Sequence, residues 1–256
     1  MFPTIFTIGT VSLHSYGLFV AIGCLAGFFL ARVEARRKNI DPDRISDLVF
    51  YALIAGIVGA RLFYALTDPA PYIQNPLALL KIWEGGLVFY GAFILAVPTI
   101  FIYARRHGLK AAVIFDILAP GLALGHFFGR IGCFLAGCCY GKASDLPFAV
   151  VFQNPGSLAP LNLGLHPVQL YSALSNLLIF GFLWLLRKRL RIDGQLFWVY
   201  VLLYAAARFF LEFFRGDFRG DFVFGILSPA QTLGVAMAGV SMVCLALSAR
   251  RASSDR

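Results

Sequence analysis

The chain alternates long apolar runs with short polar segments that carry most of its charge. Each run is close to the about 20 apolar residues that a helix needs to cross the hydrocarbon core of a bilayer. The pattern therefore predicts about seven membrane-spanning helices. The runs lie at residues 13–31, 48–67, 87–104, 112–129, 168–186, 195–214 and 224–249.

Composition points to the same class of protein. Of 256 residues, 59% are hydrophobic and 14% are charged, whereas a soluble domain is about half apolar and a quarter charged. These values exclude a disordered chain, a coiled coil and an ordinary soluble globule. We expect an all-α, polytopic integral membrane protein in which residues 1–256 form one domain. Residues 1–16 contain no Lys or Arg, so the first span is expected to be retained rather than cleaved.

The distribution of charge predicts how the helices are oriented. The net charge is +9, and most of the 22 basic residues follow the first, third, fifth and seventh runs. Basic residues stay on the cytoplasmic side of membrane proteins. The N-terminus is therefore expected outside, with a short cytoplasmic tail at residues 250–256. This bias explains the positive charge through a lipid bilayer, without a nucleic-acid partner.

A few charged residues lie within the apolar runs or at their ends. Arg208, Glu212 and Arg215 are spaced i, i+4 and i+7, so they share one helix face. Arg130 directly follows the fourth run, at its outer end, and Arg61 lies near the outer end of the second. An intramembrane cation is costly and usually has a partner or a function. An arginine oriented by a carboxylate matches the geometry of phosphate. The alternatives are a structural ion pair and snorkelling to the headgroups.

The fourth run also carries a glycine pattern and a histidine. Gly121, Gly125 and Gly129 recur every four residues, which predicts a smooth face for close packing. His126 lies one turn before Arg130 on the same face. His166 precedes a proline that is expected to begin the fifth span, with Gln169 one turn further on. A structural role and a functional role are both open for each histidine.

Three of the five cysteines cluster after the fourth run, at Cys133, Cys138 and Cys139. Their C-x4-C-C spacing differs from the C-x2-C pairs of zinc sites, so no metal is expected. Adjacent cysteines do not easily bridge each other. Any disulfide in an oxidising compartment would therefore use Cys133.

An outward site with several arginines and few carboxylates suits a phosphate-bearing lipid. It does not suit Mg²⁺-dependent phosphotransfer, which needs grouped carboxylates. The sequence Arg-Gly-Asp-Phe occurs twice, at residues 215–218 and 219–222. Because each copy balances its own charge, we interpret the segment as a solvated turn.

Several motifs together resemble one family, the prolipoprotein diacylglyceryl transferases. They follow the family order and extend over almost the whole chain. The longest is Gly129-Arg130-Ile131-Gly132-Cys133-Phe134-Leu135-Ala136-Gly137-Cys138-Cys139-Tyr140-Gly141. The others are residues 14–18, 59–62, 83–87, 166–171 and 208–215, with sequences HSYGL, GARL, WEGGL, HPVQLY and RFFLEFFR.

The resemblance implies a seven-span enzyme of the bacterial inner membrane with its N-terminus outside. Such enzymes transfer the diacylglyceryl group of phosphatidylglycerol to the thiol of the lipobox cysteine in a prolipoprotein signal peptide. They release glycerol-1-phosphate and need no cofactor. This is the first step of lipoprotein maturation.

By the same resemblance, Arg130 and Arg208 match the arginines that bind the lipid phosphate, and Glu212 matches the carboxylate that orients Arg208. The other motif positions expected near the substrates are Tyr16, Arg61, Gly85, Gly86, Cys133, Gly141, His166 and Gln169.

The chain departs from the family pattern at two positions. Tyr90 stands where many members have a histidine that is a proposed base, and Cys133 stands where many have asparagine. A tyrosine with a pKa of about 10 is a poor base at neutral pH. We hypothesise that His126 or His166 takes this role, or that Tyr90 acts as a phenolate beside Arg130.

Other classes of membrane protein fit less well. A transporter would also carry intramembrane charges, but no inverted repeat is evident. An opsin is excluded because every lysine lies in a loop. A CDP-alcohol phosphotransferase would need a cytoplasmic carboxylate cluster. A diverged paralogue with another thiol or lipid substrate is the remaining alternative.

Overall fold

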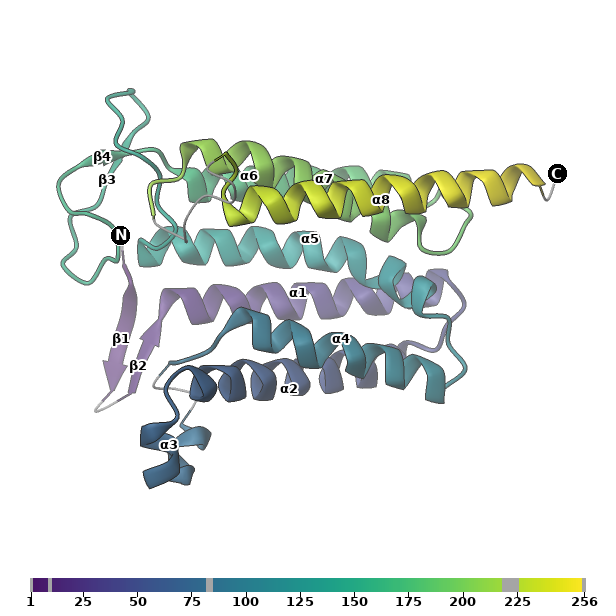
Figure 1. Ribbon diagram of the computed structural model, residues 1–256, viewed down its shortest axis with the longest axis horizontal. Coiled ribbons are helices and arrows are strands. Elements are labelled where there is room, and N and C mark those ends of the chain that lie inside the picture. The colour runs from purple at the N-terminus through teal and green to yellow at the C-terminus, as the bar shows by residue number, and fades with distance from the viewer. Residues whose placement is uncertain (1, 9–10, 82–84, 218–225, 255–256) are drawn as a thin grey trace. The chain divides into compact units, whose positions relative to one another are not determined.

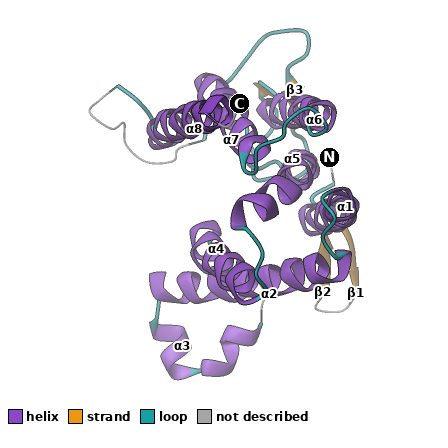
Figure 2. Cartoon of the chain, turned by 90° about the vertical axis from the view of Figure 1, so that its right-hand side faces the viewer, coloured by secondary structure: helices purple, strands orange, loops and turns teal. Residues whose placement is uncertain are grey.

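The computed structural model describes residues 2–8, 11–81, 85–217 and 226–254, and most of them are helical (Figure 2). In chain order the elements are β1 (Thr4–Ile8), β2 (Val11–His14), α1 (Ser15–Arg37), α2 (Pro42–Thr67), α3 (Ala70–Gln74), η1 (Pro76–Leu80), α4 (Phe89–Arg106), α5 (Ala111–Ala136), β3 (Val150–Val151), β4 (Gly164–Leu165), α6 (Val168–Leu186), α7 (Gln195–Leu211), η3 (Glu212–Phe214) and α8 (Pro229–Ser254).

The predicted all-α membrane fold is confirmed at the level of its helices. Six helices of the described chain are long and apolar enough to cross a membrane, namely α1, α2, α5, α6, α7 with η3, and α8. The predicted third span corresponds to α4, which has 18 residues and contains Pro98. Whether α4 completes a seventh span stays a prediction.

The chain divides into two compact units. The first unit contains residues 1–30 and 115–256, and the second contains residues 31–114. In the first unit α6 packs against α7 and α7 against α8 (Figure 1). In the second unit α2 packs against α4.

The core of the first unit joins α5 to α6 and α7. Its buried members are Ala119, Ala123, Ile179, Leu183, Leu196, Tyr200 and Val201. The buried carboxylate of Asp116 in α5 accepts hydrogen bonds from the backbone N–H groups of Gly194, at 2.8 Å, and Phe197, at 2.9 Å. It thereby satisfies two donors at the beginning of α7 that have no partner within that helix.

The glycine face predicted on α5 is confirmed for two of its three members. A Cβ on Gly121 would lie 2.9 Å from the carbonyl oxygen of Gly27 in α1. A Cβ on Gly23 would lie 3.0 Å from the oxygen of Gly125. The two backbones therefore meet without side chains between them. Gly129 has no such neighbour among the described residues.

Three local features differ from the prediction. Ahead of α1 the chain forms an antiparallel pair of strands, β1 with β2, where no element was predicted. The helix α5 continues to Ala136, so Arg130 and Cys133 lie within it rather than after it. The helix α2 begins at Pro42, six residues earlier than expected. It does so because Asp41 caps it and proline fits the first helical turn.

Candidate active site

Arg208 and Glu212 are one turn apart where α7 passes into η3, as the sequence spacing predicted. The guanidinium of Arg208 donates a hydrogen bond to the carboxylate of Glu212, and both side chains are largely buried. The Nε atom of Arg215 lies 3.7 Å from the same carboxylate. One carboxylate thus holds two arginines.

Arg215 belongs to this site, although its sequence context suggested a solvated turn. Its side chain is only 4% exposed and forms a bidentate pair with Asp217, at 2.9 and 2.7 Å. The interpretation as a solvated turn was therefore wrong for Arg215. Phe218 and the second Arg-Gly-Asp-Phe copy, residues 219–222, lie outside the described residues.

The carboxylate of Glu212 is held from a second side. Its other oxygen accepts a hydrogen bond from the hydroxyl of Ser228, at 3.1 Å. Ser228 also caps α8, because its hydroxyl accepts from the N–H of Gln231 and the Gln231 side chain accepts from the N–H of Ser228. Sequence reasoning missed this serine, although Ser-x-x-Gln before an apolar run is a recognisable helix start.

Arg130 completes an arginine cluster with Arg208 and Arg215. The charges of these three residues interact with one another, and Arg130 also interacts electrostatically with Tyr204, Cys133 and Cys139. Within the described ranges Arg130 makes no hydrogen bond or ion pair. Among the described residues, only Glu212 and Asp217 offset the three positive charges. The excess of positive charge favours an anion here.

Gly141 lies where three backbone segments meet. Its N–H donates to the carbonyl of His166 at 3.2 Å, and the N–H of Lys142 donates to the carbonyl of Phe214 at 2.9 Å. A Cβ on Gly141 would lie 2.7 Å from a methyl group of Val168 and closer still to His166. The loop after α5 is therefore fixed to the start of α6 and to the Arg215 turn.

His166 and Gln169 lie at the start of α6, as predicted, and both contact this loop, His166 through its backbone and Gln169 through its side chain. The Nδ1 atom of His166 is 3.3 Å from the hydroxyl of Tyr171, and its ring packs against Phe214. The buried amide of Gln169 donates to the carbonyl of Cys138 at 2.9 Å. In this structure Gln169 positions the cysteine segment.

His126 lies on α5 one turn from Arg130. Its Nδ1 atom is 2.8 Å from the hydroxyl of Tyr200, and its ring stacks on Tyr204 at 5.0 Å. Tyr204 is the residue whose charge also acts on Arg130. The histidine, the two tyrosines and the arginine thus form one connected polar group between α5 and α7.

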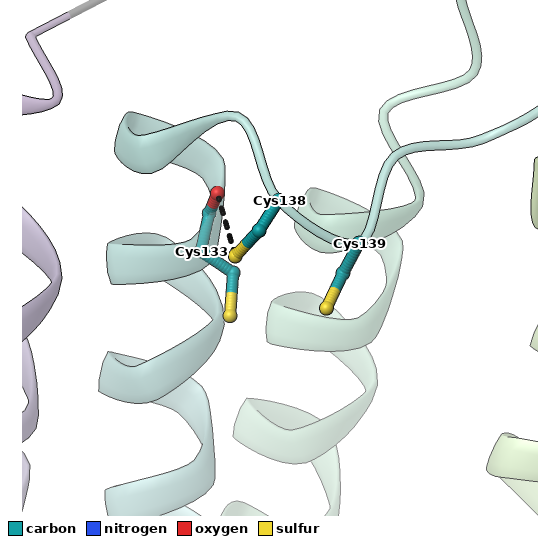
Figure 3. Close-up of side chains that lie close together, drawn as sticks. All are labelled: Cys133, Cys138 and Cys139. Carbon is teal, nitrogen blue, oxygen red and sulfur yellow. Dashed lines mark hydrogen bonds between the residues drawn. The ribbon is translucent and has the colours of Figure 1, made fainter. Parts of the chain in front are cut away.

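The three clustered cysteines converge more closely than their spacing suggested. Cys133 is in the last turns of α5, and Cys138 and Cys139 follow in the loop (Figure 3). Their sulfur atoms lie within 4.8 Å of one another, and the Cys138 thiol donates to the carbonyl of Cys133 at 3.7 Å. All five cysteines of the chain are thiols rather than disulfides.

The loop thiols differ in acidity. Hydrogen bonding with Cys133 and Cys138, and to a smaller extent the positive charge of Arg215, lower the pKa of Cys139 below the usual thiol range, although burial acts to raise it. Hydrogen bonds with Cys133 and Cys139, together with burial, raise the pKa of Cys138. Burial acts to lower the pKa of Arg215, but its bonds to Asp217 and Cys139 raise that pKa overall.

Tyr16, at the start of α1, adjoins the same cluster. A Cβ on Gly132 would lie 3.2 Å from the Tyr16 Cα atom, so the two helices touch at this point. The charges of Cys133, Cys138, Cys139 and Arg130 all act on the Tyr16 hydroxyl, and its side chain is 47% exposed. The predicted motif residues of the first unit thus lie in one neighbourhood.

Arg61 lies in the second unit and is 6% exposed. Its guanidinium donates five hydrogen bonds of 2.6–3.2 Å, to the carbonyls of Ala78, Leu79, Lys81, Gly85 and Gly86. Gly85 and Gly86 both have positive φ values, of 88° and 72°, which favour glycine. Arg61 therefore organises this loop, and its predicted contact with substrate stays a prediction.

Two further motif positions need separate mention. Tyr90 lies in the first turn of α4 with its side chain 69% exposed. It belongs to the second unit, so its predicted role as a phenolate beside Arg130 stays a prediction. Trp83 and Glu84 of the motif at residues 83–87 lie outside the described residues.

Comparisons with known proteins agree with this arrangement of motifs. A family model described as prolipoprotein diacylglyceryl transferase matches residues 3–247. A phosphatidylglycerol–prolipoprotein diacylglyceryl transferase of Clostridium tetani is 37% identical over 92% of this chain and 93% of its own length. The protein of that name in Bordetella avium is 34% identical over 98% of this chain and 96% of its own. The chain belongs to the prolipoprotein diacylglyceryl transferase family.

Proposed function

We propose that the chain transfers the sn-1,2-diacylglyceryl group of phosphatidylglycerol to the thiol of the lipobox cysteine of a prolipoprotein. The products are a thioether-linked prolipoprotein and glycerol-1-phosphate. Family membership and the names of the relatives support this reaction. The observation that carries it is the cluster of Arg130, Arg208 and Arg215, which only the carboxylates of Glu212 and Asp217 offset among the described residues.

In this proposal the arginine cluster binds the lipid phosphate and stabilises the charge that develops on it. The thiol sulfur attacks the glyceryl carbon, a C–S bond forms and the C–O bond to phosphate breaks. Guanidinium groups oriented in advance are strong donors to phosphate oxygens. Glu212 orients Arg208, and Ser228 orients Glu212.

The attacking thiol has to lose its proton, because an ordinary cysteine has a pKa of about 8.5. His126, His166 and Tyr90 are the candidate bases. Both histidines are partnered by tyrosine hydroxyls. Full activity in both His126→Ala and His166→Ala would refute the histidine hypothesis. The remaining candidates for promoting loss of the thiol proton would then be Tyr90 and the positive charge of Arg130.

The arrangement in the membrane is part of the proposal. We propose seven spans in one integral domain of the bacterial inner membrane, with the N-terminus outside and the C-terminus cytoplasmic. The alternation of basic segments supports this orientation. The arginine cluster would then face the outer side, with lateral access for lipid and for the signal-peptide helix. Tyr16, Arg61, Gly85, Gly86, Cys133, Gly141 and Gln169 are proposed to line or shape the substrate sites.

Release of glycerol phosphate tests the reaction directly. Purified protein in phosphatidylglycerol liposomes is given a lipobox peptide, and a peptide with serine in place of the cysteine serves as the control. We expect release that needs the thiol and is lost in Arg208→Ala. Release without the peptide would indicate lipase-like activity instead. No release from folded wild-type protein would refute the proposal.

A further inference from the structure

We propose that Cys133 and Cys139 form a site of reversible thiol oxidation, and that the disulfide between them raises the affinity of the arginine cluster for the lipid phosphate. The co-reactant is an external disulfide, either of a small thiol such as glutathione or of an oxidising protein. The loop after α5 is proposed to face the outer side of the inner membrane, a compartment in which disulfides form and persist. The inference rests on the transferase function proposed above and adds its regulation.

The clustered thiols are close enough to react with one another. Their sulfur atoms lie within 4.8 Å, and a disulfide brings two sulfur atoms to about 2 Å. A change of side-chain rotamer at one or both cysteines can close such a gap. Figure 3 shows the Cys138 side chain directed from the loop toward Cys133 in α5, with Cys139 beside it.

The two loop thiols differ in how readily they start the reaction. The thiolate, not the thiol, attacks a disulfide. Arg215 donates a hydrogen bond to the sulfur of Cys139 and favours its thiolate, so Cys139 reacts first. Adjacent cysteines do not easily bridge each other, which leaves Cys133 rather than Cys138 as its partner. Cys139 is partly exposed and Cys133 is buried, so the oxidant reaches the attacking thiol before the second one.

The backbone fixes the position of Cys139. Its φ of 59° is uncommon for a residue with a side chain, and such a conformation persists only where the surroundings hold it. The carbonyl of Cys138 before it accepts a hydrogen bond of 2.9 Å from the buried amide of Gln169. Gly141 after it is tied to the backbone of His166. A thiol on a backbone that is already ordered loses little conformational entropy when the bridge forms.

The exchange is balanced in thiols and disulfides. The Cys139 thiolate attacks one sulfur of the external disulfide and displaces the other as a thiolate. That thiolate takes the proton of Cys133, whose sulfur then attacks the Cys139 sulfur and displaces the second external thiolate. Two cysteines are thereby oxidised to one disulfide, and one external disulfide is reduced to two thiols.

The bridge changes the net charge beside the phosphate site. The excess of one positive charge in the arginine cluster is that of the protein with Cys139 neutral. A thiolate at Cys139 acts on both Arg130 and Arg215 and cancels this excess. A disulfide carries no charge, so oxidation restores the excess. The phosphodiester of phosphatidylglycerol carries one negative charge and no longer competes with the thiolate for the same arginines.

Mass spectrometry tests the modification independently of activity. The reduced protein is incubated with glutathione disulfide, free thiols are alkylated, and peptides are mapped without reduction. We expect a bridge between Cys133 and Cys139, with Cys138 alkylated. Cys133→Ala should stop at a mixed disulfide between glutathione and Cys139. The matched control, Cys24→Ser/Cys244→Ser, lacks the cysteines in α1 and α8 and should form the wild-type bridge. Absence of this bridge in folded wild-type protein would overturn the proposal.

The effect on the phosphate site is tested with glycerol phosphate release at varied phosphatidylglycerol content. The oxidant is removed before the lipobox peptide is added, and initial rates are compared. We expect a KM for phosphatidylglycerol that is about 10-fold lower in the oxidised protein, the scale of one charge–charge interaction near a protein surface. The control variant Cys24→Ser/Cys244→Ser should show the same response. A KM that is unchanged or higher after oxidation would overturn the regulation and leave the transferase intact.

A matched pair of variants separates the effect of charge from that of the covalent bridge. Cys139→Asp keeps a negative charge, Cys139→Asn has nearly the same size without it, and both residues tolerate a positive φ. We expect the lower KM in the Asn variant and no response to oxidation in either. Equal KM values in the two variants would contradict the charge argument. No release in any preparation, although the bridge forms, would instead refute the transferase.

Discussion

Arg208 and Glu212 are joined by a largely buried ion pair at the end of α7, and Glu212 is itself held by Ser228. The remaining donors of Arg208 make no hydrogen bond within the described part of the chain. A buried guanidinium held on one side only is prepared to bind an anion on the other. Substitution of Arg208 is therefore the most direct test of the proposed phosphate site.

We expect Arg208→Ala to lower glycerol phosphate release by at least about 100-fold, because the loss of one preorganised donor to developing charge costs about 3–4 kcal/mol. Arg208→Lys should recover only part of the rate, since lysine lacks the planar fork. Arg105→Ala, which removes an exposed arginine in the last turn of α4, is the control and should keep full activity. Equal rates in Arg208→Ala and wild type would exclude the clamp.

A pair of glycines in the same motif should behave in opposite ways. Gly141→Ala places a Cβ against His166 and Val168, so we expect a loss of about 1–3 kcal/mol in stability and of most activity. Gly129→Ala meets no atom within 4 Å among the described residues and replaces glycine in a helix, which favours folding by up to about 1 kcal/mol.

The measurements for this pair are thermal unfolding in detergent and glycerol phosphate release. Gly129→Ala controls for the general effect of adding a methyl group to the motif. If Gly141→Ala unfolds at the wild-type temperature and releases glycerol phosphate at the wild-type rate, the close contacts around Gly141 are needed neither for stability nor for activity.

The positions of the helices were predictable because long apolar runs and their polar interruptions are local in sequence. The i, i+4 pairing of Arg208 with Glu212 was predictable for the same reason. The extension of α5 through Arg130 to Ala136 was not, because a glycine-rich segment gives a weak apolar signal. The result is that Cys133 is a helical residue facing Cys138 across a turn.

Contacts between distant segments were beyond sequence reasoning. The bond from Ser228 to Glu212 spans sixteen residues. The five carbonyls around Arg61 come partly from η1 and partly from residues after it, and no repeating sequence pattern links them. A charge count could not show that Arg215 is buried beside Cys139, because burial depends on how the loop after α5 crosses the end of α7.

Arg61 should affect stability more than any other arginine in the second unit. Its five hydrogen bonds fix the loop that ends in Gly85 and Gly86, and each bond to a charged donor contributes about 1.5–3 kcal/mol. We expect Arg61→Ala to lower the unfolding temperature markedly and Arg61→Lys to restore part of it. Gly86→Ala should also lower the unfolding temperature, since its Cβ would meet the ring of Tyr64 and lie 2.7 Å from the guanidinium of Arg61. Wild-type unfolding of Arg61→Ala would contradict this structural role.

The acidity of Cys139 gives a prediction about pH. Because its pKa is lowered, Cys139 should remain a thiolate, and react with iodoacetamide, at pH values below the usual thiol range. Cys138, whose pKa is raised, should react only at higher pH. The labelling rate of each cysteine is followed by mass spectrometry in reduced, metal-free protein between about pH 5 and pH 9.

Substitutions identify the cause of this acidity. Cys133→Ala removes the first hydrogen bond to the Cys139 sulfur, so the pKa should rise and labelling at pH 6 should slow. Arg215→Met should act in the same direction through the loss of positive charge. Cys24→Ser/Cys244→Ser leaves the cluster intact and should keep the wild-type profile. The contrary result would be that Cys138 and Cys139 of the wild-type protein are labelled with the same pH dependence, near the usual thiol pKa. In that case neither the neighbouring thiols nor the charge of Arg215 lowers the pKa of Cys139.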